Sequence, residues 1–203
     1  MEIFYNLIFL CLISFIIGAI PTAYLAGRIF KGLDIRQHGS GNVGATNAFR
    51  VLGKKIGFFV FFIDFLKGFI PSFLLSKLII GDNLDAGEVG LWIGVSAILG
   101  HVFTPFLGFK GGKGVATGAG VLCGSFPLLF LCVTSIWIVL FKLTRTVSIS
   151  SLSSLISLVL LSLFFKQHLS VTAIFLGVCL FTFWTHRENI QRLIEGKEHK
   201  INR

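Results

Sequence analysis

The stretch GFKGGKG (residues 108–114) runs directly into VATGAGVLCGSFPLLFLCVTSIWIVLF (residues 115–141), and together they decide the fold. The second stretch is longer than the roughly 20 apolar residues that one helix needs to cross a bilayer. Residues that weaken a helix interior interrupt it at Gly118, Gly120, Gly124 and Pro127. The sequence therefore predicts two short helices over this stretch, and a single kinked helix is the alternative.

The composition is that of a protein embedded in a membrane. Hydrophobic residues make up 54% of the 203 positions and charged residues only 13%, with a mean hydropathy of +0.87. Soluble domains carry about 25% charged residues. We expect one all-α integral-membrane domain over residues 1–203. Its net charge of +9 indicates contact with anionic lipid or substrate, and we expect no nucleic-acid partner.

Charged residues between the apolar segments predict the topology. The segments are Phe4–Ile29, Ile56–Ile80, Val89–Phe106, Val115–Phe141, Ser148–Phe165 and Val171–Trp184. Basic residues dominate four of the connecting regions, whereas residues 81–88 carry Asp82, Asp85 and Glu88 and no base. The positive-inside rule places the basic regions in the cytoplasm.

Two of these basic regions flank residues 115–141, namely Lys110 with Lys113 and Lys142 with Arg145. One crossing cannot leave both in the cytoplasm, so residues 115–141 must enter and return. We therefore expect seven transmembrane helices, some of them short or broken. The N-terminus lies outside and the C-terminus lies in the cytoplasm. Four cysteines sit inside apolar runs and are expected to pack as small hydrophobic residues: Cys11, Cys123, Cys132 and Cys179.

Three polar segments follow membrane segments on the predicted cytoplasmic side. The first is Gly39–Arg50, which matches Gly-x-Gly-x-x-Gly but lacks the preceding strand of a dinucleotide site. Arg50 can hold a phosphate through two parallel hydrogen bonds. The candidate hydrogen-bonding residues are Ser40, Asn42, Thr46 and Asn47. The alternative is that Thr46 or Asn47 caps a helix.

The second polar segment is Gly100–Thr117. It lacks the spacing of a nucleotide-binding P-loop, so nucleotide hydrolysis is disfavoured. Glycines let successive backbone N–H groups surround an anion, and lysines add charge. The candidate ligand-binding residues are Lys110, Gly111, Gly112, Lys113, Gly114 and Thr117. His101 is either a substrate contact or a packing hydrogen-bond partner.

The third polar segment is His186–Asn189. On a helix, His186 and Asn189 would share a face, and histidine exchanges protons near neutral pH. The basic residues after it also suit an amphipathic anchor on anionic lipid. Asp64 and Lys67 lie within an apolar segment, where charged side chains usually pair. We expect a structural ion pair between them, with direct ligand contact as the alternative.

These segments resemble the bacterial acyl-phosphate:glycerol-3-phosphate acyltransferase (PlsY) family. The resemblance covers the whole chain and rests on three long motifs in order, at residues 40–50, 100–117 and 186–189, with Asp64–Gly68 also similar. It implies a seven-helix enzyme of the bacterial cell (inner) membrane with a cytoplasmic active site. It implies transfer of an acyl group from acyl phosphate to the sn-1 hydroxyl of glycerol 3-phosphate. The products would be lysophosphatidic acid and phosphate, in the first acylation of phospholipid synthesis.

The resemblance also implies residue roles. Ser40 and Arg50 are similar to essential first-motif residues, and the second-motif glycines to a phosphate-binding loop. His186 and Asn189 are similar to residues needed for activity, and Glu188 to one needed for structural integrity. We assign glycerol phosphate to Arg50, Lys113, His186 and Asn189, and the acyl phosphate head to the glycine loop with Ser40. The reverse phosphate assignment stays open.

The proton acceptor stays open between His186 and a substrate phosphate. No metal or other cofactor is expected, the membrane lipid is the surrounding partner, and we expect a monomer. The rival functions are a membrane carrier for a phosphorylated solute and a head-group transferase with a nucleotide-activated donor. A carrier would need sites reached in turn from both faces. A head-group transferase would need an acidic metal site.

Overall fold

The computed structural model describes residues 2–79 and 85–200, and their side chains from residue 6 onward. Ile80 and Asp82, which the sequence placed at a segment end and in the acidic loop, lie outside the described residues. The described part of the chain is helical and contains no strand, which confirms the all-α class. It forms two compact units, Met1–Ser125 and Phe126–Arg203, and each is described by itself. The single domain over residues 1–203 stays a prediction.

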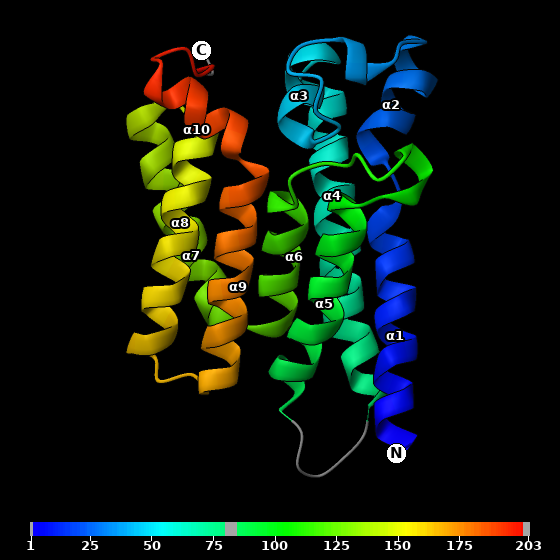
Figure 1. The fold of residues 1–203 in the computed structure, drawn as a ribbon, viewed down its shortest axis with the longest axis vertical. Coiled ribbons are helices and arrows are strands. Elements are labelled where there is room, and N and C mark those ends of the chain that lie inside the picture. Colours follow the sequence, from blue (N-terminus) through cyan, green and yellow to red (C-terminus); the bar gives the residue numbers. More distant parts are fainter. Residues whose placement is uncertain (1, 80–84, 201–203) are drawn as a thin grey trace. The chain divides into compact units, whose positions relative to one another are not determined.

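The described part of the first unit holds six α-helices (Figure 1). They are α1 (Glu2–Ala19), α2 (Thr22–Lys31), α3 (Ala45–Val51), α4 (Lys54–Leu74), α5 (Ala86–Val102) and α6 (Val115–Ser125). Short 3₁₀ helices occupy Ile35–Gln37, Leu75–Leu78 and Pro105–Leu107. Helix α4 packs most extensively on α6, and α1 packs on α5.

The first apolar segment is broken, although the sequence predicted one continuous helix from Phe4 to Ile29. Helix α1 ends at Ala19 and α2 begins at Thr22, after Pro21. Proline has no N–H to continue a helical hydrogen-bond pattern. The carbonyls exposed at the break are bonded by other elements, because Thr104 donates to Ala19 at 2.6 Å and Lys67 Nζ to Ile20 at 3.0 Å.

Helices α4 and α6 meet backbone to backbone. A Cβ atom at Gly68 would overlap the carbonyl of Thr117, and one at Gly120 would overlap the carbonyl of Phe65. Small residues at such contacts let membrane helices approach closely. Gly118, Gly120 and Gly124 therefore lie inside α6 and do not form the break that the sequence assigned to them jointly with Pro127. Glycine lowers the helix propensity at residue 120, but the close packing of α4 on α6 leaves no room for a larger side chain.

The predicted interruption of residues 115–141 is confirmed, and it falls at Phe126. Helix α6 ends at Ser125 and α7 starts at Pro127, a residue well suited to the first turn of a helix. The kinked-helix alternative is therefore wrong for this stretch.

The second unit contains α7 (Pro127–Thr144), α8 (Val147–Phe164), α9 (Leu169–Thr185) and α10 (Arg187–Ile194). The serine-rich start of α8 packs between helices. Ser150, Ser151 and Ser154 are buried, and Trp137 of α7 donates its indole N–H to Ser151 Oγ at 3.1 Å.

Within the described residues, five helical stretches are long and apolar enough to span a membrane. They are Asn6–Lys31, Lys54–Leu78, Ala86–Leu107, Pro127–Thr144 and Val147–Phe164. The pair α9 and α10, bent by 62°, makes a sixth if it is one span, and α6 is a shorter apolar helix. The chain is thus a multi-pass membrane protein, while seven spans and the orientation of the termini stay predictions.

Candidate functional site

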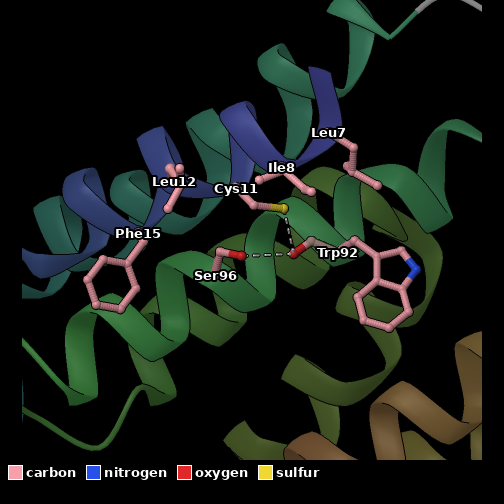
Figure 2. A pocket seen from close by; sticks show the side chains of 7 residues that line it. All are labelled: Leu7, Ile8, Cys11, Leu12, Phe15, Trp92 and Ser96. Carbon is pink, nitrogen blue, oxygen red and sulfur yellow. Dashed lines mark hydrogen bonds between the residues drawn. The ribbon is translucent and has the colours of Figure 1, made fainter. Parts of the chain in front are cut away.

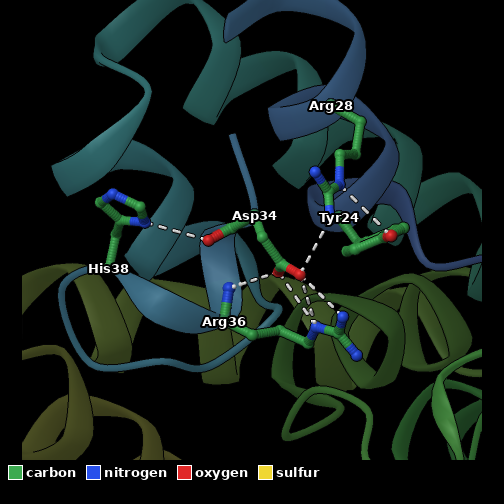
Figure 3. A network of polar contacts seen from close by, with 5 residues as sticks. All are labelled: Tyr24, Arg28, Asp34, Arg36 and His38. Atoms are coloured by element: carbon green, nitrogen blue, oxygen red, sulfur yellow. Dashed lines mark hydrogen bonds and ion pairs between the residues drawn. The ribbon is translucent and has the colours of Figure 1, made fainter. Parts of the chain in front are cut away.

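An ionic clamp precedes the first polar segment. Arg36 donates from Nη2 to Asp34 Oδ2 at 2.7 Å and from Nε to Oδ1 at 3.0 Å, and Arg28 reaches the same carboxylate at 3.2 Å (Figure 3). Both guanidinium groups also lie over the ring of Tyr24. The hydrogen bonds from Arg36 outweigh the opposing effect of burial and lower the pKa of Asp34 to about 2. The clamp fixes the chain between α2 and the first polar segment.

Asn47 organises the first polar segment from within. Its Nδ2 donates to the carbonyls of His38 and Asn42, both at 3.0 Å, and its Oδ1 accepts from the N–H of Ser40 at 3.0 Å. The side chain is only 1% exposed. A Cβ atom at Gly39, where φ is +62°, would overlap Asn47 Oδ1. The amide of Asn47, expected to bind substrate, is therefore engaged in shaping the loop.

The remaining first-segment residues surround this folded loop. Ser40 and Arg50 are exposed, and Asn42 and Thr46 are half-buried. Helix α3 begins with Gly44 as its N-cap and has no side-chain cap. The capping alternative for Thr46 and Asn47 is therefore wrong.

The second polar segment turns back on the end of α5. The N–H groups of Gly111 and Gly112 donate to the carbonyls of Val102 at 2.9 Å and His101 at 3.1 Å. The expectation that successive loop amides surround an anion is wrong for these two, because they complete the hydrogen bonding of α5. Helix α6 begins just beyond, and the first N–H groups of a helix attract anions.

The lysines of this segment differ in exposure. Lys110 is exposed and Lys113 is half-buried. Gly114, where φ is +83°, joins the loop to α6. Thr117, expected to bind substrate, is fully buried, and its hydroxyl has no hydrogen-bond partner among the described residues. The cationic part of the segment is therefore formed by Lys110, Lys113 and the start of α6.

A buried charged cluster supports the loop. Lys67 Nζ lies 2.8 Å from Asp64 Oδ1, which confirms the expected ion pair, and the residues are 5% and 1% exposed. His101 Nδ1 lies 3.9 Å from the same Asp64 oxygen. A Cβ atom at Gly112 would overlap His101 Nε2. The imidazole thus lies between the ion pair and the backbone of Gly112, and we interpret His101 as a support for the loop.

The first two polar segments share one end of the first unit. Figure 1 places α3 and the segment after α5 at the end of α1 away from the N-terminus. Leu107 of the second segment packs on a core cluster that includes Ile35, Val43 and Ala48 from around the first segment. Arg50, Lys110 and Lys113 therefore belong to the same end of this unit.

The third polar segment belongs to the second unit. His186 is 4% exposed and lies at the bend between α9 and α10, and its Nδ1 is 2.9 Å from the carbonyl of Thr182. A carbonyl can only accept, so Nδ1 carries a proton and the lone pair of a neutral ring lies on Nε2. Asn189 Nδ2 donates to Glu198 Oε1 at 2.6 Å. Glu188, expected to be structural, is exposed.

An apolar groove runs between α1 and α5. Its volume is about 290 Å³, and its lining comprises Leu7, Ile8, Cys11, Leu12, Phe15, Trp92 and Ser96 (Figure 2). The groove contains no charged side chain and is therefore unsuited to a phosphate. Among the described residues, no group of three or more His, Cys, Asp or Glu side chains could hold a metal ion.

Two acidic residues that organise these segments escaped the sequence reasoning. They are Asp34 and Glu198, and neither was singled out from the sequence. The available signals were the two arginines beside Asp34 in sequence and the turn-forming Gly196 just before Glu198. Neither signal identifies the residue that accepts the hydrogen bonds, which depends on tertiary contacts.

Known proteins resemble the chain over nearly its whole length. A family model described as glycerol-3-phosphate acyltransferase matches residues 8–196. Glycerol-3-phosphate acyltransferase from Staphylococcus saprophyticus is 44% identical over 199 residues, covering 96% of this chain and 98% of that one. The Listeria monocytogenes protein of the same name is 42% identical over 196 residues, covering 97% of each.

A solved structure gives the same result for the fold. The crystal structure of PlsY, an integral membrane glycerol 3-phosphate acyltransferase in its glycerol 3-phosphate form, is similar with a TM-score of 0.86. The two proteins are 38% identical, and the match covers 97% of this chain and 96% of that one. A lysophosphatidic acid form of that protein matches with the same TM-score and identity.

Proposed function

Because this chain belongs to the glycerol-3-phosphate acyltransferase family, we propose that it acylates glycerol 3-phosphate at the sn-1 hydroxyl with acyl phosphate as donor. The products are lysophosphatidic acid and inorganic phosphate, and the reaction is the first acylation of phospholipid synthesis. The observation that carries the proposal is the match over almost the whole chain, which includes all three polar segments.

The chemistry requires two anions to be held together in one site. The sn-1 oxygen attacks the acyl carbonyl carbon, the carbon–oxygen bond to phosphate breaks, and the hydroxyl proton is released. Acyl phosphate is a mixed anhydride whose phosphate leaves readily, so positioning supplies much of the rate. Arg50, Lys110 and Lys113 offset the repulsion between the two phosphates. Their placement at one end of the first unit supports this role.

We assign the phosphate of glycerol 3-phosphate to Arg50 and Lys113. The acyl phosphate head binds Ser40, Lys110 and the start of α6, while its acyl chain lies among apolar helices. Gly112 and Asn47 act by shaping the two loops. The ion pair of Asp64 and Lys67 is structural, as is His101.

His186 is the proposed proton acceptor. Its Nδ1 donates to the carbonyl of Thr182, so the lone pair of a neutral ring lies on Nε2. A substrate phosphate oxygen is the alternative acceptor. A general base contributes about 10²- to 10⁴-fold to the rate, so we expect His186→Ala to lose activity within that range while His186→Gln stays equally slow.

The protein is proposed to lie in the bacterial inner membrane with the polar segments in the cytoplasm, where both phosphorylated substrates occur. Basic residues of these segments support this orientation. We further propose that the protein acts as a monomer and without a metal.

The deciding experiment uses purified protein with palmitoyl phosphate and glycerol 3-phosphate, and measures both phosphate and lysophosphatidic acid. We expect the two products in equal amounts, dependent on both substrates. Acyl-CoA in place of palmitoyl phosphate tests the donor. Absence of lysophosphatidic acid with either donor would refute the enzyme function, and product from acyl-CoA alone would refute the donor.

A further inference from the structure

The break between α1 and α2 is held by side chains from two other parts of the first unit. The carbonyl of Ala19 accepts from Thr104 Oγ1 at 2.6 Å, and the carbonyl of Ile20 accepts from Lys67 Nζ at 3.0 Å. Both donors are buried, since Thr104 is 1% exposed and Lys67 is 5% exposed. The direction in which α2 leaves α1 therefore depends on these tertiary hydrogen bonds.

Helix α2 carries the first polar segment. Two of its residues, Ala23 and Ala26, are buried in one core cluster with Val43 and Ala48. Figure 1 shows α2 and α3 at the same end of this unit. The ionic clamp adds a second connection from α2 to the chain just before the segment. A change in the direction of α2 would therefore displace the whole segment, including Arg50.

Thr104 connects the same break to the second polar segment. It precedes the 3₁₀ turn of that segment, and its carbonyl accepts from the N–H groups of Leu107 at 3.3 Å and Phe109 at 2.9 Å. Its hydroxyl meanwhile donates to the carbonyl of Ala19. One buried residue thus bonds the turn of the second segment through its backbone and the break through its side chain.

We propose that Thr104 is a positioning residue whose hydroxyl, by holding the break, sets the spacing between the first and second polar segments. In the proposed function each phosphate contacts one residue of each segment, Arg50 with Lys113 and Ser40 with Lys110. The spacing of the segments then determines how well both phosphates are held. This inference rests on the proposed function and adds the residue that adjusts its anion sites to one another.

Thr104→Val removes the hydroxyl and nearly preserves the shape of the side chain. The carbonyl of Ala19, a residue only 1% exposed, then loses its donor, which is unfavourable for a buried group. The N–H groups in the first turn of α2 are the donors nearest to it along the chain, because the first turn of a helix leaves such groups without partners within the helix. The break would reorient toward them, and α2 would change direction.

Steady-state kinetics test the consequence. We expect Thr104→Val to raise the KM for glycerol 3-phosphate and for palmitoyl phosphate about 10-fold each, as when hydrogen bonds to charged groups are weakened. A loss of folded protein would lower kcat and leave both KM values unchanged. Thr104→Ser restores the hydroxyl and should restore both KM values, and Thr104→Cys, with a weaker donor, should lie between.

Ser14→Ala is the matched control. Ser14 Oγ donates to the carbonyl of Ile93 at 2.7 Å and is 0% exposed, so this bond also joins α1 to α5 through a buried hydroxyl. It lies within the two helices and away from the break. We expect Ser14→Ala to lower the melting temperature about as much as Thr104→Val, with both KM values as in the wild type.

A second measurement needs no substrate. Spin labels on cysteines that replace the exposed residues Gln37 and Phe106, in a cysteine-free background, report the spacing between the chain that α2 carries and the second segment. We expect Thr104→Val to change the distance distribution between the labels and Ser14→Ala to leave it unchanged.

The outcomes separate the inference from the proposed function. KM values in Thr104→Val equal to those in Ser14→Ala would overturn the inference, and so would an unchanged distance distribution. Failure of the wild-type protein to make lysophosphatidic acid would count against the proposed function, whereas the distances between the labels would still test the spacing.

Discussion

Gly112→Ala tests whether the buried cluster determines the position of the second polar segment. A Cβ atom at residue 112 would overlap Nε2 of His101, whereas ordinary contacts begin at 3.4 Å. The imidazole cannot retreat, because it is buried and its Nδ1 lies 3.9 Å from Asp64. The loop that carries Lys110 and Lys113 must therefore move outward.

The size of the effect follows from that displacement. A shift of about 1 Å in a substrate-positioning group can lower the rate about 100-fold, and we expect that loss in kcat/KM. Overpacking of this kind also destabilises by about 1–3 kcal/mol. Phosphate release from palmitoyl phosphate gives the first quantity, and the melting temperature in detergent gives the direction of the second.

Gly118→Ala is the matched control. Its Cβ atom would meet Ile98 Cδ1 at 3.7 Å, an ordinary contact, and alanine favours the helix by up to about 1 kcal/mol. We expect unchanged kinetics and equal or higher stability. If Gly112→Ala retained the wild-type kcat/KM while remaining folded, the idea that His101 positions the loop would be untenable.

Three further predictions concern the buried pair, the ionic clamp and the topology. Lys67→Met leaves Asp64 charged and buried, so we expect a loss of stability of about 3–5 kcal/mol. Adding Asp64→Asn to this variant should largely reverse the loss, as melting temperatures will show. Equal losses of stability in the single and double variants would contradict this. The pKa of Asp34 falls from 3.8 to about 2 on folding, so its charged form stabilises the protein above about pH 4 and this contribution disappears as the pH falls toward 2. The melting-temperature difference between wild type and Asp34→Asn should therefore shrink over that range, and a constant difference would argue against the clamp. A cysteine that replaces the 76% exposed Leu143, in a cysteine-free background, should react with impermeant reagents added from the cytoplasmic side. A cysteine that replaces His168 should react with the same reagents added from the other side. Labelling of both cysteines from one side would contradict a single crossing by α8.

The membrane class, the helical fold and the polar segments could be predicted because each depends on local sequence. Apolar runs of the right length form helices in a bilayer, since no other partner is there for their backbone groups. The interruption near Pro127 was also predicted from a local cause, because proline has no N–H with which to continue a preceding helix. The break at Pro21 has the same local cause but was missed, since the surrounding run is apolar and long enough to look continuous.

The role of each polar residue depended on contacts between distant parts of the chain. Asn47 and Thr117 were both taken as substrate ligands from their residue type, yet one shapes its own loop and the other is buried beside α4. Glu188 and Glu198 are acids near the same motif, and only the reversal of the chain at Gly196 brings Glu198 onto Asn189. A hydrogen-bond partner is chosen by three-dimensional position, which residue type alone does not specify.

The sequence by itself therefore determined that this protein spans a membrane, and that basic and polar residues gather in three segments. These properties follow from the hydrophobicity and charge of successive residues, which can be summed along the sequence without knowledge of the fold. Only the tertiary structure decided that Gly111 and Gly112 complete the end of α5, that His101 lies between an ion pair and the loop, and that Glu198 accepts a hydrogen bond from Asn189. Such arrangements arise because most buried polar groups are hydrogen-bonded, and the fold determines which partners are within reach.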